Sequence, residues 1–204
     1  MSRRFADIAF TPAVQALQEQ HGSRAQYARM QAHADAGPVV DDDVAAFLGE
    51  ADHFWLATVG ATGWPYVQHR GGPRGFLRAL SPTRIGFADF RGNLQYVSAG
   101  NVAGDDRVAL IVVDYAHRRR LKLLGHLRFV DARDADADVA AAVAVPGYRA
   151  RVERIALIDV VAVDWNCPQH ITQRFTLDEV EAAAQPLRDR IAALEREIEA
   201  ARTR

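Results

Sequence analysis

Short apolar runs separated by turn residues fill the middle of the chain, and they constrain its fold more than any other feature. These runs span residues 54–59, 66–69, 76–80, 85–87, 108–115, 121–130 and 155–163. Glycine, proline, serine and asparagine stand in the gaps, for example at Gly60–Gly63, Gly71–Pro73 and Arg91–Asn93. Strands of this length with turn signals between them favour antiparallel pairing. We therefore expect an α+β fold that is mainly antiparallel β, with the sheet closed into a barrel.

Helices are expected on both sides of this region and twice within it. Thr11–Pro12 predicts the start of a helix that reaches Gly22, because Thr caps free amides and Pro suits the first helical position. A second helix is expected over 24–33, and Asp41–Asp43 predict a third by placing acidic groups at a helix start. Residues 94–104 and 134–145 predict helices inserted between strands.

The C-terminal segment predicts a long helix. Thr176 and Glu179 form a capping box, which marks its start. Leu187, Ile191, Leu194 and Ile198 then recur at spacings of three and four, which makes an apolar seam suited to a partner helix. Pro186 is expected to kink or restart the helix. The predicted organisation is a helical extension over 1–40, a barrel over 41–175 and a helix over 176–204.

The charge and the cysteine content limit which partners and which cellular compartment are expected. The formal net charge is −1, so we expect neither nucleic acid nor a membrane surface as a partner. Cys167 is the one cysteine, which excludes an internal disulfide and a paired-cysteine metal knuckle, and no metal site is expected. No apolar stretch follows the basic residues at the start of the chain. A cytoplasmic protein is the expectation.

Polar residues follow the last strand run at unusual density. The segment from Trp165 to Ile171 reads WNCPQHI, and Arg174 lies three residues further on. A turn alone needs no such set of donors, so the segment predicts a ligand site. Its candidate binding residues are Trp165, Asn166, Cys167, Gln169, His170 and Arg174. The alternatives are a buried structural cysteine, a nucleophilic Cys167 with His170 as its base, and a core role for Trp165.

Three further segments are candidates for binding. Gln68, His69 and Arg70 end one strand before a glycine turn, which also fits ordinary solvated polar residues. Residues 89–101 lead from a strand into a short helix and would gather amides and hydroxyls at its start, where phosphate binds; helix capping is the alternative. The candidates there are Arg91, Asn93, Gln95, Ser98 and Asn101. Arg119 and Arg120 lie on a hairpin, either in solvent or bonding an anion.

Together these segments resemble the pyridoxamine 5′-phosphate oxidase-like flavoproteins, the FMN-binding split barrels. The resemblance covers about residues 41–175 and follows five segments in order: 64–70, 87–101, 106–110, 119–125 and 165–174. It is closest to a bacterial branch that shares the WNCPQHI run. It implies a split β-barrel that forms a homodimer, with FMN at the subunit interface and each site lined by both chains.

The resemblance also implies roles for single residues. Gln68, His69 and Arg70 match the strand beside the flavin and its phosphate, and Asn93, Gln95 and Ser98 match the phosphate loop. Arg120 matches a side chain that reaches the flavin, and 165–174 matches the region that closes over the ring. The vitamin B6 oxidases carry Arg where this chain has Gln68, Lys where it has Pro73, and Arg-Lys near Asn93. Their terminal Arg-Leu-Ala-Pro is also absent. Arg70, Arg91 or Arg119 would then bind the phosphate.

The expected function is hydride transfer between flavin N5 and a small organic substrate, with His170 or His69 relaying a proton. These departures argue against pyridoxine phosphate as that substrate. A deazaflavin remains an alternative to FMN. Two other functions stay open: a flavin- or haem-binding sensor or carrier without turnover, whose C-terminal helix dimerises, and a purely structural dimer module.

Overall fold

The computed structural model describes residues 3–33 and 38–203, which form two compact units. The first unit comprises the chain up to Asp114 together with Arg119–Pro168. The second comprises Tyr115–Arg118 together with the chain from Gln169 onward. The first unit holds the sheet, and the second holds the long C-terminal helix.

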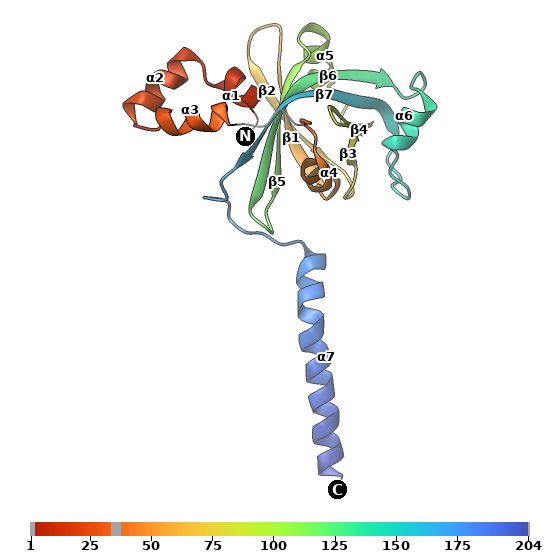
Figure 1. The fold of residues 1–204 in the computed structure, drawn as a ribbon. Coiled ribbons are helices and arrows are strands. Elements are labelled where there is room, and N and C mark those ends of the chain that lie inside the picture. The colour runs from red at the N-terminus through yellow and green to blue at the C-terminus, as the bar shows by residue number, and fades with distance from the viewer. Residues whose placement is uncertain (1–2, 34–37, 204) are drawn as a thin grey trace. The chain divides into compact units, whose positions relative to one another are not determined.

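One antiparallel sheet of seven strands makes up the body of the first unit (Figure 1). Its spatial order is β2-β1-β5-β6-β7-β4-β3. The strands are β1 His53–Val59, β2 Pro65–Gly71, β3 Leu77–Ser81, β4 Arg84–Phe90, β5 Arg107–Asp114, β6 Arg119–Asp131 and β7 Val152–Asn166. Each of the seven expected runs is a strand, so the prediction of an α+β fold built mainly on antiparallel β structure is confirmed.

One detail of the sheet confirms the expected split barrel, and one differs from the expectation. Over the described residues β2 and β3 are the two edges of the sheet and do not pair with each other, as in a split barrel. The last strand was expected to end at Val163 but continues to Asn166, because β6 pairs with it that far: Leu121 lies opposite Trp165, and Arg120 lies opposite Asn166. Asp164, Trp165 and Asn166, which were expected beyond the strand, therefore belong to it.

Small helices surround the sheet. They are α1 Arg3–Ala9, α2 Pro12–Gln20, α3 Arg24–Ala32, α4 Asp42–Gly49, α5 Val97–Gly104 and α6 Ala137–Ala142. The expected caps are present: Thr11 Oγ1 accepts a hydrogen bond from Val14 N at 3.4 Å, and Asp41 Oδ1 accepts one from Val44 N at 2.8 Å. The sequence did not predict α1, although its Phe5 and Ala6 are buried.

The core of the first unit lies on the inner face of the sheet. Phe54, Phe76 and Phe87 are almost fully buried there, and their ring centroids lie 5.2–6.3 Å apart. Gly125 lies at a register shift in β6, where an added Cβ would come within 2.6 Å of Asp159 O on β7. Glycine is required at this position because β6 and β7 approach too closely for a side chain.

Helix α7, Leu177–Arg202, makes up most of the second unit. Its capping box is present as predicted: Thr176 Oγ1 accepts from Glu179 N, and Glu179 Oε2 accepts from Thr176 N at 2.8 Å. The helix runs through Pro186 without a break, which excludes a restart and leaves the expected kink as a prediction. Among the residues that the structure describes, no helix has the length and apolarity needed to cross a membrane.

Candidate functional site

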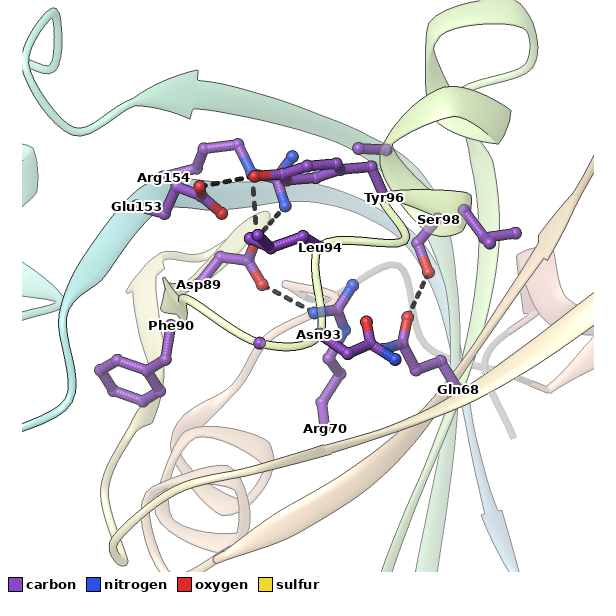
Figure 2. Close-up of a pocket in the computed structure, with 13 residues that line it drawn as sticks. Gln68, Arg70, Asp89, Phe90, Asn93, Leu94, Tyr96, Ser98, Glu153 and Arg154 are labelled. Atoms are coloured by element: carbon purple, nitrogen blue, oxygen red, sulfur yellow. Dashed lines mark hydrogen bonds and ion pairs between the residues drawn. The ribbon is translucent and has the colours of Figure 1, made fainter.

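Residues from four elements line an open polar pocket in the first unit, which we call the β2–α5 pocket (Figure 2). It lies where β2, the end of β4, the start of β7 and the start of α5 meet. Its lining residues are Gln68, Arg70, Asp89, Phe90, Gly92, Asn93, Leu94, Tyr96, Val97, Ser98, Ala99, Glu153 and Arg154. Hydrogen-bonding groups dominate this set, which suits a polar or charged part of a ligand.

A carboxylate held between two guanidinium groups organises the floor of the pocket. Arg70 Nη1 donates to Asp89 Oδ1 at 2.7 Å. Arg154 donates to Asp89 Oδ2 through Nε at 3.0 Å and Nη2 at 2.6 Å. The Asp89 side chain is 2% exposed, and those of Arg70 and Arg154 are 14% and 20% exposed. Burial to this degree makes the pairing necessary, because an isolated buried charge is costly.

The fold brings these three residues together through strand pairing and sheet curvature. Asp89 and Arg154 are direct cross-strand partners in the β4–β7 pair. Arg70 comes from β2, which is separated from β4 in the sheet order by β1, β5, β6 and β7. A side chain on β2 reaches β4 only because the sheet curls round on itself. Gln68 shares the inward face with Arg70, since side chains alternate along a strand.

Arg70 retains unused donor capacity. Its Nε is buried and has no hydrogen-bond partner, although Nη1 is bonded to Asp89. Burial lowers the pKa of the Arg70 guanidinium, and the nearby Arg154 charge adds to this effect, while Asp89 opposes it. A buried donor without a partner is uncommon in a folded protein. An anion or a carbonyl oxygen in the pocket would satisfy it.

The start of α5 gives the pocket a second set of donors. Leu94 and Tyr96, at φ 63° and 53°, adopt left-handed backbone that favours glycine, and no side chain caps the helix at Tyr96. The first amides of an uncapped helix lack acceptors and attract anions. Positive φ at non-glycine residues is costly and concentrates at functional sites. This helix start is therefore a candidate anion-binding element of the pocket.

Side-chain hydrogen bonds fix the walls around this helix start. Ser98 Oγ donates to Gln68 Oε1 at 2.9 Å, which ties α5 to β2. Tyr96 Oη donates to Glu153 Oε1 at 2.7 Å, and this bond raises the pKa of the Tyr96 phenol. The Arg154 guanidinium lies over the Tyr96 ring at 5.0 Å and over the Phe129 ring at 4.7 Å. The pocket is therefore held in shape by its own contacts.

The structure divides the candidates predicted in this region. Gln68, Arg70, Asn93 and Ser98 line the pocket, whereas His69, Arg91, Gln95 and Asn101 do not. His69 is exposed, and its ring contacts His53 and Trp55 at centroid distances of 5.7 and 6.0 Å. Asn101 Nδ2 donates to Thr58 Oγ1 at 2.9 Å and so anchors α5 to β1.

A second group of candidates lies where β6 and β7 approach α4. The Arg119 guanidinium lies over the Phe47 ring at 5.0 Å and over the Trp165 ring at 4.9 Å. The two rings contact each other edge to face at 4.9 Å. Arg119 and Trp165 therefore pack against each other and against Phe47. Beside them, Arg120 Nε and Asn166 Oδ1 are buried without a hydrogen-bond partner.

The remaining candidates are exposed. Cys167 is a free thiol near the end of the first unit, while Gln169, His170 and Arg174 belong to the second unit. His170 has a left-handed backbone at φ 62°, and the Arg174 guanidinium lies over the Tyr115 ring at 4.8 Å. Across residues 3–33 and 38–203, no group of three or more His, Cys, Asp or Glu side chains is arranged to hold a metal ion.

Asp89, Tyr96, Glu153 and Arg154 line the pocket but were not among the predicted site residues. A signal for Asp89 existed: it is a charged residue in the apolar run of β4 and therefore needs a buried partner. Identifying Arg154 as that partner requires the β4–β7 register, in which the two residues are opposite but 65 positions apart.

Comparison with protein-family models identifies one family. A model of the pyridoxamine 5′-phosphate oxidase family matches residues 40–164. No curated protein matches the sequence.

Several solved structures are similar. HupZ from Group A Streptococcus is 14% identical, covers 66% of this chain and 98% of its own, and has a TM-score of 0.49. A putative pyridoxamine 5′-phosphate oxidase from Lactobacillus delbrueckii is 15% identical, covers 63% and 96%, and has a TM-score of 0.47. An FMN-binding protein from Nostoc punctiforme is 17% identical, covers 62% and 82%, and has a TM-score of 0.44.

Proposed function

The chain belongs to the pyridoxamine 5′-phosphate oxidase family, and we propose that it is an FMN-dependent oxidoreductase whose β2–α5 pocket binds the flavin phosphate. The observation that carries this proposal is the unsatisfied Nε of Arg70, buried beside the uncapped start of α5. Both features provide donors without acceptors in one pocket. A phosphate group supplies the acceptors that they lack.

The charge balance of the pocket sets how the phosphate would be held. Arg70 and Arg154 contribute two positive charges, and Asp89 and Glu153 contribute two negative charges. Net attraction is therefore weak, and hydrogen bonds from Arg70, from the Gln68 amide and from the first amides of α5 would carry most of the binding. This arrangement fits a phosphate monoester, and it predicts moderate FMN affinity.

Bound flavin supplies hydride exchange at N5 with a small organic substrate, and the protein supplies binding and orientation. Gln68 and Ser98, which are fixed to each other, would position the phosphate end. His170 is our proposed proton carrier. His69 lies outside the pocket and contacts Trp55, so it serves this role only for a ligand on the other face of β2.

We also propose a homodimer with the flavin at the subunit interface. Strand β2 supports this because it is an edge strand on which no residue is buried. Trp64, beside it, is 78% exposed, and Val67 is 59% exposed. Large apolar side chains at a sheet edge favour association with another chain. A partner on this edge would lie next to Gln68 and Arg70.

The direct test is spectroscopic. Purified protein is expected to show flavin absorbance, or to quench FMN fluorescence saturably when titrated, and mass spectrometry of the released ligand identifies FMN or a deazaflavin. A colourless protein that leaves FMN fluorescence unchanged would overturn the proposal. Bound flavin that neither a nicotinamide donor nor oxygen turns over would instead indicate the carrier function.

A further inference from the structure

Helix α7 carries an apolar seam that repeats in strict heptads along its whole length. Successive seam residues are separated by three and four positions in alternation, which is the coiled-coil spacing. The first position of each heptad holds Leu177, Ala184, Ile191 and Ile198. The fourth position holds Val180, Leu187, Leu194 and Ala201. The seam is three layers longer at its start and one layer longer at its end than the four residues noted in the sequence.

The seam is exposed in the single chain. None of the residues of α7 is buried, and Leu177, Leu187 and Ile191 are 80%, 68% and 56% exposed. A row of large apolar side chains on an isolated helix is unfavourable in water. The sheet family's matched region ends at residue 164, so the seam lies outside it.

We propose that α7 forms a parallel two-stranded coiled coil with α7 of a second copy of this chain. Charge complementarity supports self-pairing. In a parallel pair, the residue just before a first position (heptad position g) contacts a residue of the other helix. That residue comes just after the following fourth position (heptad position e). Arg190 then faces Glu195 of the second copy, and Glu197 faces Arg202. Each pair occurs twice by symmetry, and all four contacts are attractive.

The identity of the seam residues supports the orientation. Ile191 and Ile198 at first positions, combined with Leu187 and Leu194 at fourth positions, favour two parallel strands. In a parallel pair in register, each of the eight seam residues also packs against the same residue of the second copy. An antiparallel pair that matches Leu187 with Ile191 also fills every layer, but it brings Arg190 opposite Arg190 of the second copy, which is repulsive.

This inference is independent of the proposed flavin site, since no residue of α7 lines the β2–α5 pocket. It assigns α7 a role in holding two copies together whether or not flavin is bound. Pro186 is compatible with it, because this residue lies at the third heptad position, away from the seam.

Cysteine cross-linking of the full chain tests the proposal without reference to flavin. With Cys167→Ser as background, Ala201→Cys is expected to form an interchain disulfide under oxidised glutathione, because each new thiol meets its own copy across the seam. Ala200→Cys is the matched control: it is the adjacent residue along the helix but lies outside the seam. Little cross-linking is expected for it. Equal yields from the two variants, or none from Ala201→Cys, would overturn the proposal.

A second pair of variants tests whether packing of the seam, and not only closeness of the two thiols, produces the disulfide. Leu194→Asp, added to Ala201→Cys, is expected to abolish the disulfide, whereas Ala193→Asp, one residue away and off the seam, leaves it intact. Retained cross-linking with Leu194→Asp would show that the seam does not hold the helices together. Cross-links between Leu177→Cys and Ala201→Cys chains, but none within Ala201→Cys alone, would show antiparallel pairing and equally contradict the proposal.

Discussion

The β2–α5 pocket contains an arginine that the sequence predicted as a flavin ligand, and so does the Arg119–Trp165 cluster, which is formed by Phe47, Arg119 and Trp165. The two arginines have different surroundings. In the pocket, Arg70 faces a buried carboxylate and keeps one buried donor without a partner. In the cluster, the Arg119 guanidinium is stacked against the Phe47 and Trp165 rings. The neighbours of an arginine, more than its presence, decide whether it is available to a ligand.

The largest expected effect concerns the charge in the pocket. Asp89→Asn removes the carboxylate between Arg70 and Arg154, so we expect the free energy of unfolding to fall by about 3 kcal/mol. Urea denaturation measures it. Asp159→Asn is the control, because its ion pair with Arg84 is partly exposed, and we expect a loss of at most about 1 kcal/mol. Similar losses for the two variants would show that the buried ion pairs of Asp89 stabilise the fold no more than the exposed ion pair of Asp159.

The same Asp89→Asn variant should bind FMN more tightly than the unmodified protein, because the pocket gains net positive charge. Fluorescence titration measures this change. Weaker FMN binding by the folded variant would argue that Asp89 positions the arginines for the phosphate instead of competing with it.

A smaller effect is expected in the cluster. Trp165→Ala removes the ring contact with Phe47 and the surface on which Arg119 lies, and it should lower the free energy of unfolding by about 2 kcal/mol, since the indole is only partly buried. If the cluster is structural, the folded variant retains its FMN affinity. Loss of FMN binding with little change in stability would make Trp165 a ligand residue instead.

The smallest expected effect is a shift in the pKa of Tyr96, which lines the pocket. The hydrogen bond to Glu153 raises the pKa of Tyr96 above its ordinary value of 10.0. Because the folded pKa is raised, the contribution of this bond to stability is complete below the unfolded pKa and is lost as the pH rises through the folded one. The difference in tyrosinate absorbance between the unmodified protein and Tyr96→Phe reports this titration. Glu153→Gln should move it to lower pH.

The sequence predicted the parts of the fold that depend on local pattern. Short apolar runs between turn residues predicted the seven strands, and the Asp41 and Thr176 caps predicted helix starts, because these signals lie within a few residues of each other. Helix α1 was missed because it spans only seven residues, which is too short for a clear apolar periodicity. The end of β7 was misplaced because it depends on pairing with β6.

The candidate site was predicted only in part for the same reason. Gln68 and Arg70 were found because they end a strand, and Asn93 and Ser98 because they precede and open a helix. Asp89 and Arg154 were missed because their importance arises from long-range pairing. His69 was grouped with its neighbours, although alternation along β2 turns it away from them.

The most direct test of the phosphate position compares FMN with riboflavin, which lacks the phosphate. We predict that Arg70→Gln lowers FMN affinity about tenfold or more, the loss of one charge-assisted hydrogen bond, and leaves riboflavin affinity unchanged. Arg84→Gln, at an ion pair elsewhere in the sheet, should change neither affinity. Equal FMN affinity in Arg70→Gln and the unmodified protein, or an equal loss for both ligands, would contradict the assignment of the β2–α5 pocket to the phosphate.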